Sequence, residues 1–324
     1  MIRRPPRSTL SSSSAASDVY KRQNLACMQI IKYTSFHFIT LLFFFSLLSF
    51  QPGLTQNFAI YKNLENDSLQ FSVKKAAVSS GLLLSCVGMI TLTIDEAYYQ
   101  DNRVKFHFAK DANGNLTWFD NYHRAMDKFG HGFSTSLFSQ NIYFLSRWSG
   151  YSNQTSSILA SSISIGLLGA MEVWDAHFES WGFSVGDFIS NVAGGMYPVL
   201  QYNYRPLQNI DYKMSYNFIK KKSADHGIHD YEHMTFWLTV NPRGFSDLKY
   251  MQWFPNWLNI AAGIGLDSYQ NQKQEFYIGL DYNLKRIKTD SLLLNQLIAF
   301  IDRFHFPAPA IRVSPGTVYY GFFF

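Results

Sequence analysis

Three predicted helices within residues 74–203 each carry a pair of polar residues in an otherwise apolar setting. The pairs are Asp127 with His131, Glu172 with Asp175, and Asp187 with Asn191. Residues three or four apart lie on one helix face, so each pair points in one direction. If the three faces converge, His131, Glu172 and Asp187 could bind one divalent metal and leave a coordination position open for water.

Two other interpretations of these residues remain open. Without a metal, His131 oriented by Asp127 could act as a general base, with Glu172 as the acid. Carboxylates packed together have divergent pKa values, which suits that division of roles. A structural interpretation is a buried polar network that fixes the register of the helices. Supporting polar residues in all three cases are Lys128, Asp175, Ser184 and Asn191.

The segment Gly182-Phe183-Ser184-Val185-Gly186 matches the G-x-S-x-G pattern of serine hydrolases. That nucleophile requires a strand before the serine and a helix after it, within a parallel sheet. The sequence predicts only the helix. Ser184 as a helix N-cap, with the acidic Asp187 three residues later, is therefore the favoured interpretation.

A second group of histidines and acids lies between residues 224 and 233, with His226, His229 and His233 among them. Such residues could bind a metal. No helical or strand pattern gives them a fixed frame, so a solvated loop is the favoured interpretation.

Residues 74–203 have the periodicity of helices. The expected helices are 76–94, 126–148, 155–175 and one that starts at 184 and ends before Pro198. The first contains 19 residues without charge, which is long enough to span a membrane but also suits a buried core helix. The third is rich in Ser, Gly and Ala, which allow helix backbones to approach closely. We expect a bundle of about four helices, in or on a membrane.

Residues 212–324 alternate like strands. The expected strands are 212–218, 234–240, 257–267, 275–284 and 317–324. A helix over 291–304 interrupts them, and Pro307 and Pro309 terminate it. The fold class is therefore α+β, with a helical bundle followed by a small antiparallel β-rich part that packs on it.

The net charge of +5 comes from the N-terminal region. Residues 1–23 carry a net charge of +4 and resemble a translated sequencing adapter, so we exclude them from the fold. Residues 24–55 add one positive charge, at Lys32, which leaves 56–324 neutral. A chain without excess positive charge lacks the electrostatic signal of a nucleic-acid-binding protein. The expected partner is a membrane lipid or an envelope component.

Residues 28–55 are predicted to be a signal peptide, with Lys32 before an apolar core over 36–50 and small residues before Gln56. An uncleaved anchor is the alternative. Cys27 precedes the apolar core and no cysteine follows it directly, so a lipoprotein cleavage motif is missing. We expect export to the periplasmic face of the envelope, with the outer membrane as one destination.

The polar motifs carry a family resemblance. They are Asp127-Lys128-Phe129-Gly130-His131, then Glu172-x-x-Asp175, then Trp181-Gly182-Phe183-Ser184-Val185-Gly186-Asp187 with Asn191 four residues on. Together they resemble the YfiM-like family, domain of unknown function 2279, in its Bacteroidetes form. The order of motifs is similar, more loosely, to VanZ-like membrane proteins. The resemblance implies an exported, membrane-associated protein, often described as a periplasmic lipoprotein, and no established activity.

The sequence thus predicts an exported envelope protein with a structural or accessory role. The alternative is a metal-dependent or acid–base hydrolase or transferase that acts on a lipid-like envelope substrate. The residue pattern leaves open whether the chain is an enzyme.

Overall fold

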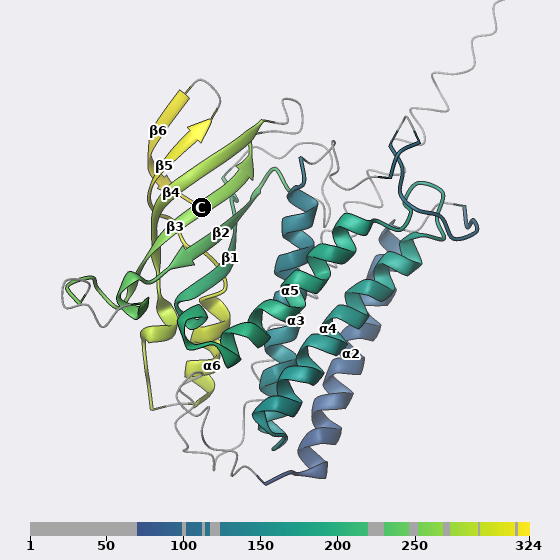
Figure 1. Cartoon of the computed structure of the whole chain (residues 1–324), viewed down its shortest axis with the longest axis horizontal. Helices are drawn as coiled ribbons and strands as arrows, with labels where there is room; N and C mark the ends of the chain where they lie inside the picture. Colours follow the sequence, from purple (N-terminus) through teal and green to yellow (C-terminus); the bar gives the residue numbers. More distant parts are fainter. Residues whose placement is uncertain are drawn as a thin grey trace, which may run out of the picture.

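A computed structural model describes residues 70–98, 102–111, 114–116, 124–219, 230–245, 252–267, 273–290, 292–314 and 317–324. It contains four long helices, then a six-stranded antiparallel sheet with one short α-helix inserted (Figure 1). The expected α+β class is confirmed. The predicted adapter-derived segment 1–23 and signal peptide 28–55 lie outside the described residues.

The long helices are α2 (Val73–Tyr98), α3 (Met126–Trp148), α4 (Asn153–Asp175) and α5 (Val185–Asn203). Serine caps start two of them. The hydroxyl of Ser152 accepts a hydrogen bond from the Thr155 N–H, and that of Ser184 accepts one from the Asp187 N–H. Such caps satisfy N–H groups that have no partner within the helix.

The prediction that the fourth helix ends before Pro198 was wrong, because α5 continues through Pro198 to Asn203. A proline inside a helix removes one backbone hydrogen bond. Packing offsets this loss, since Gln201 and Tyr202 in the last turn are buried. The Tyr202 ring stacks on the Tyr143 ring of α3, with centroids 3.5 Å apart.

Helices α3 and α5 approach each other closely at a pair of glycines. A Cβ atom added to Gly194 would lie only 2.1 Å from the carbonyl oxygen of Gly132. Two turns further along α3, the Ser139 hydroxyl donates a 2.8 Å hydrogen bond to the carbonyl of Gly195, the neighbour of Gly194. The absence of side chains at the crossing therefore sets the distance between the two helices, and with it the positions of the polar residues nearby.

The sheet is a meander in the order β1-β2-β3-β4-β5-β6, with every neighbouring pair antiparallel. Its strands are β1 (Ile210–Tyr216), β2 (Met234–Val240), β3 (Leu258–Leu266), β4 (Gln274–Tyr282), β5 (Ala308–Ser314) and β6 (Thr317–Phe323). Helix α6 (Leu292–Ile301) lies between β4 and β5 in the chain. Strand β5 was not predicted from the sequence, because Pro309 was interpreted only as the end of the preceding helix. Pro309 pairs with Phe322 of β6, and pairing with β4 begins at Ala310.

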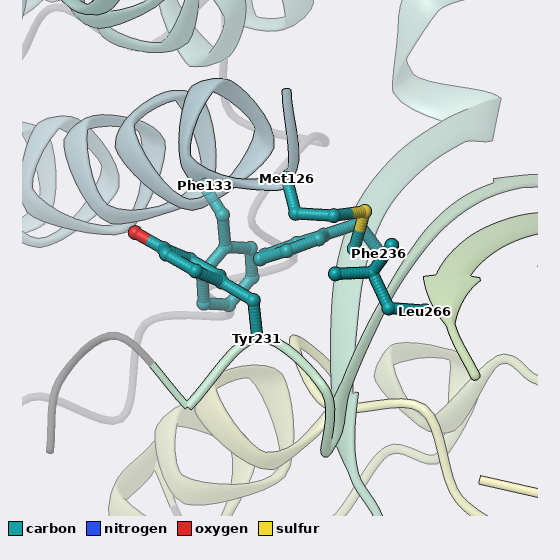
Figure 2. Close-up of a cluster of buried hydrophobic side chains, with 5 residues drawn as sticks. All are labelled: Met126, Phe133, Tyr231, Phe236 and Leu266. Atoms are coloured by element: carbon teal, nitrogen blue, oxygen red, sulfur yellow. The ribbon is translucent and has the colours of Figure 1, made fainter. Parts of the chain in front are cut away.

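The bundle contacts the sheet through one buried apolar cluster. Met126 and Phe133 of α3 pack against Phe236 of β2 and Leu266 of β3, with Tyr231 beside them (Figure 2). This contact fixes the first half of α3, which carries Asp127, Lys128 and His131, against the sheet.

Two described helices have the length and hydropathy of membrane spans, α2 over Val73–Leu92 and α4 over Asn153–Asp175. This criterion uses length and composition alone, which core helices of soluble proteins also satisfy.

Candidate functional site

His131, Glu172 and Asp187 come together where α3, α4 and α5 meet. One ligand atom of each side chain lies within 4.8 Å of the other two. His131 comes from the second turn of α3, Glu172 from the last turn of α4, and Asp187 from the first turn of α5. The close crossing of α3 and α5 brings these groups together.

Lys128 connects two carboxylates across this site. Its ammonium Nζ lies 2.6 Å from Asp127 Oδ2 and 2.8 Å from Asp187 Oδ1. All three side chains are nearly buried. Burial by itself lowers the pKa of Lys128, but the charges of Asp187 and Asp127 outweigh it and raise the pKa above its usual value. Lys128 therefore stays charged and holds α5 to α3.

The Nδ1 atom of His131 lies 3.3 Å from Asn191 Oδ1 and 3.3 Å from Glu172 Oε1. The Asn191 amide nitrogen donates to Glu172 Oε1 at 3.3 Å, and its oxygen accepts from the Thr135 hydroxyl at 2.8 Å. This network assigns the proton of neutral His131 to Nδ1. The other nitrogen, Nε2, then carries the lone pair and lies 3.9 Å from Asp187 Oδ1.

Glu172 is the most strongly perturbed acid of the site. Burial raises its pKa to about 9, helped by the charges of Asp187 and Asp175 and opposed by Lys128 and the Asn191 hydrogen bond. Only 1% of the residue is exposed. At neutral pH Glu172 is therefore a neutral carboxylic acid, which accords with the cost of burying an unpaired negative charge.

The supporting residues occupy the edges of this site. Asp127 pairs with Lys128, whereas Asn191 and Glu172 contact the Nδ1 of His131. Asp175 ends α4, and its backbone carbonyl accepts hydrogen bonds from the N–H groups of Phe178 and Gly182.

Ser184 caps α5 and does not have the setting of a hydrolase nucleophile. Its hydroxyl accepts from the Asp187 N–H at 3.3 Å. Within the described residues, the segment before it forms only isolated bridges, Phe183 with Phe108 and Phe178 with Arg103, in place of a strand of a parallel sheet. The strand–turn–helix setting that this motif requires is therefore missing from the described part of the chain.

Thr135, which was not predicted as a site residue, is fully buried and bonded to Asn191. Its signal was its position: Thr135 lies four residues after His131, on the same helix face as the predicted polar pair. The His131 carbonyl oxygen also lies 2.8 Å from this hydroxyl and is the alternative acceptor for its single proton, as is common for threonine inside a helix.

The favoured interpretation of residues 224–233 as a solvated loop was wrong for its described part. Asp230, Glu232 and His233 are all buried. His233 Nδ1 lies 2.6 Å from Asp230 Oδ1, and its ring stacks on Tyr216 of β1. The start of β2 supplies the frame that the sequence pattern did not indicate. His226 and His229 lie outside the described residues.

Two hollows in the described part of the chain lie against α4, away from the polar site. One is lined by residues that include Ser161, Gly169 and Phe188, and the other by residues that include Arg103 and His177. Neither is lined by His131, Glu172 or Asp187. The polar site is closed on most sides, because Glu172 and Asp187 are buried, although about a fifth of the His131 side chain remains exposed.

Residues 116–203 match the model of a family described as predicted periplasmic lipoprotein, DUF2279. The segment is therefore similar to that family. It contains every residue of the polar site, and its description agrees with the predicted export to the periplasmic face of the envelope. No curated protein and no solved structure has a significant match to the chain. The likeness to Bacteroidetes members and to VanZ-like proteins stays a prediction.

Proposed function

We propose that this protein is a structural or accessory component of the cell envelope, associated with a membrane, and that its polar site holds α3, α4 and α5 in register. This proposal rests on the ion pairs and hydrogen bonds that connect side chains of different helices within the site. Lys128 of α3 pairs with Asp187 of α5. Asn191 of α5 bonds Thr135 of α3 and Glu172 of α4.

The energetics of burial support a role in specificity. Buried ion pairs add little net stability, because desolvation of both charges offsets their attraction. Removal of one partner is costly, however, since it leaves the other charge buried and alone. Such a network penalises every arrangement of the helices except the one that satisfies it. The near-complete burial of Glu172 and Asp187 also favours a structural role.

The test is the stability of Asn191→Ala against that of Asn203→Ala. Asn191 is fully buried and bonds both neighbouring helices. Asn203 is an exposed asparagine at the end of the same helix, and it bonds only its own turn. We expect Asn191→Ala to lower the free energy of unfolding by about 2–3 kcal/mol and the control to change it by less than about 0.5 kcal/mol. Denaturant titration measures both. Unchanged or raised stability in Asn191→Ala would favour a catalytic site, because such sites are often strained.

An acid–base hydrolase or transferase for a lipid-like envelope substrate is the second candidate. One observation favours it: a possible proton acceptor, His131, and a neutral acid, Glu172, are neighbours, with His131 Nδ1 3.3 Å from Glu172 Oε1. His131 would take a proton from the attacking group, and Glu172 would supply one to the leaving group.

The metal-dependent form of this candidate rests on three ligand atoms within 4.8 Å of one another. A metal at about 2 Å from each ligand would compete with the Lys128 ammonium for Asp187. Elemental mass spectrometry on protein purified with a non-histidine tag tests it. About one equivalent of zinc, manganese or iron, lost in Glu172→Ala and kept in the exposed control Glu179→Ala, would support a metal enzyme. A folded sample without metal would reject that form.

A further inference from the structure

The six-stranded sheet turns its polar side chains inward. Lys213 of β1 is fully buried, 2.8 Å from Asp281 Oδ2 of β4 and 3.0 Å from Asp302 Oδ1 after α6. The Nδ1 of His305 bonds the same Asp281 at 2.9 Å, and the His305 ring stacks on Trp237 of β2, 3.9 Å between centroids. Other buried polar residues of this face are Asp211, Ser215, Thr239, Asn259 and Glu275.

The opposite face of the sheet is apolar and largely bare. From β3 to β6, every outward position except Gln274 carries an apolar or aromatic side chain. The strand register aligns them in rows across the sheet, such as Ala262, Ile278, Ile311 and Tyr320. Ile278 is 62% exposed and Phe322 is 70% exposed. We call the outward residues of β3 to β6, apart from Ile264 and Leu266, which belong to the buried cluster at α3, the apolar sheet face.

This face continues an interface that the molecule already has. Over β1 and β2 the same side of the sheet packs on α3, where Phe133 contacts Tyr212 and Phe236. In soluble proteins, the polar side chains of a strand face water and the apolar ones face the core, whereas in this sheet the polar side chains face inward. Polar-inside and apolar-outside alternation is typical of strands in contact with lipid.

We propose that the apolar sheet face lies against a membrane of the envelope and inserts its side chains among the acyl chains of one leaflet. The inference rests on the membrane association proposed above, for which it supplies the contact surface. The outward positions of β3–β6 carry no charged residue, and this lack of charge matches the uncharged acyl chains of lipid. Interfaces between proteins usually contain about one hydrogen bond per 100–200 Å². The outward side chains of this face have few groups that could form such bonds, which makes a protein partner a poorer fit than lipid.

Exposed aromatic residues that suit the membrane surface lie on β6 and in the chain segment before β3. Trp253 is 77% exposed and Trp257 is 57% exposed just before β3, and Tyr320 is 78% exposed in β6. Tryptophan and tyrosine favour the headgroup level, where one side of the ring is apolar and the other is hydrated. An open sheet edge is not tolerated in hydrocarbon. The sheet therefore lies flat on the leaflet, with the β6 edge at the headgroups.

The experiment uses the full chain with both cysteines replaced by serine and one new cysteine at Ile278→Cys, labelled with a polarity-sensitive fluorophore. Asp290→Cys is the matched control, because Asp290 is exposed in the connection that follows β4. Both proteins are mixed with phosphatidylethanolamine–phosphatidylglycerol vesicles, with and without lipid that carries a nitroxide near the top of its acyl chain. Vesicle flotation measures binding in the same samples.

We expect a blue shift of the fluorophore at 278 and quenching several-fold stronger than at 290. A blue shift without quenching would mean that protein, such as a second copy of this chain, covers the face, and would overturn the proposal. Flotation with a water-like spectrum at 278 would also overturn it, but would leave membrane association through another segment in place. Absence of flotation would reject both. Val313→Cys, on the same face of β5, repeats the test if Ile278→Cys folds poorly.

Discussion

The ammonium group of Lys128 on α3 lies 2.8 Å from the carboxylate of Asp187 in the first turn of α5. The family model covers both residues, and a second carboxylate, Asp127, lies 2.6 Å from the same ammonium. One buried cation thus neutralises acids on two helices. Its position has direct consequences for stability.

Lys128→Met should lower the free energy of unfolding by about 3–5 kcal/mol, because it removes the ammonium group that pairs with two nearly buried carboxylates. Lys74→Met, at an exposed lysine of α2, is the matched control and should change stability by less than about 0.5 kcal/mol. Denaturant titration by circular dichroism measures both. Adding Asp187→Asn to Lys128→Met should restore part of the loss. If Lys128→Met lowers the free energy of unfolding by less than about 1 kcal/mol, the ion pairs of Lys128 are screened by solvent like those at a protein surface.

Glu172 should make the stability of the protein depend on pH. The unfolded chain releases this proton near pH 4.5 and the folded chain only near pH 9, so between these values the folded state binds more protons. The free energy of unfolding should therefore fall as the pH rises through this window, by up to about 1.4 kcal/mol per pH unit. The loss is complete once the pH exceeds the folded pKa.

Glu172→Gln should flatten this dependence, because glutamine mimics the neutral acid and does not ionise. Glu179→Gln removes an exposed carboxyl and should leave the slope as in the wild type. Thermal unfolding between pH 5 and pH 9 compares the three proteins. If Glu172→Gln and the wild type share one slope, Glu172 is ionised in the folded state and its proposed role as a proton donor is lost.

Gly194→Ala should separate α3 from α5. The new Cβ would lie 2.1 Å from the Gly132 carbonyl, which is backbone and cannot move without the helix. We expect a loss of about 3 kcal/mol or misfolding, as for overpacked cores. Gly166→Ala is the control, because no atom lies within 4 Å of its added Cβ. That variant should gain up to about 1 kcal/mol from helix propensity. Similar stability of the two variants would argue against the close crossing.

Ser184→Ala should cost about 1 kcal/mol, the usual value of a helix N-cap. Ser152→Ala, at the N-cap of α4, removes the same kind of bond and should cost a similar amount. A fluorophosphonate probe, which labels activated serines, should leave the wild-type protein unlabelled. Labelling that disappears in Ser184→Ala and persists in Ser152→Ala would establish the nucleophile that the G-x-S-x-G pattern suggested.

The sequence indicated much of the helical half. Helix periodicity places Asp127 and His131, or Asp187 and Asn191, on one face whatever surrounds them. Serine at position 184 with an acid three residues later marks a helix start, which the structure has. Strand alternation located five of the six strands. Pro309 concealed the remaining one, since a proline can occupy a strand where its missing N–H is not required for pairing.

Only the tertiary structure decided which groups meet. The pairing of Lys128 with Asp187, and of Asn191 with Glu172, depends on the distance and rotation of three helices. The Gly132–Gly194 crossing sets the α3–α5 part of that arrangement. The same holds for the sheet, where the alternation shows two faces but not which one is buried. The buried pairs of Lys213 settle that question. Local periodicity is a property of the backbone and can be predicted from sequence, whereas contacts between distant segments depend on how the whole chain packs.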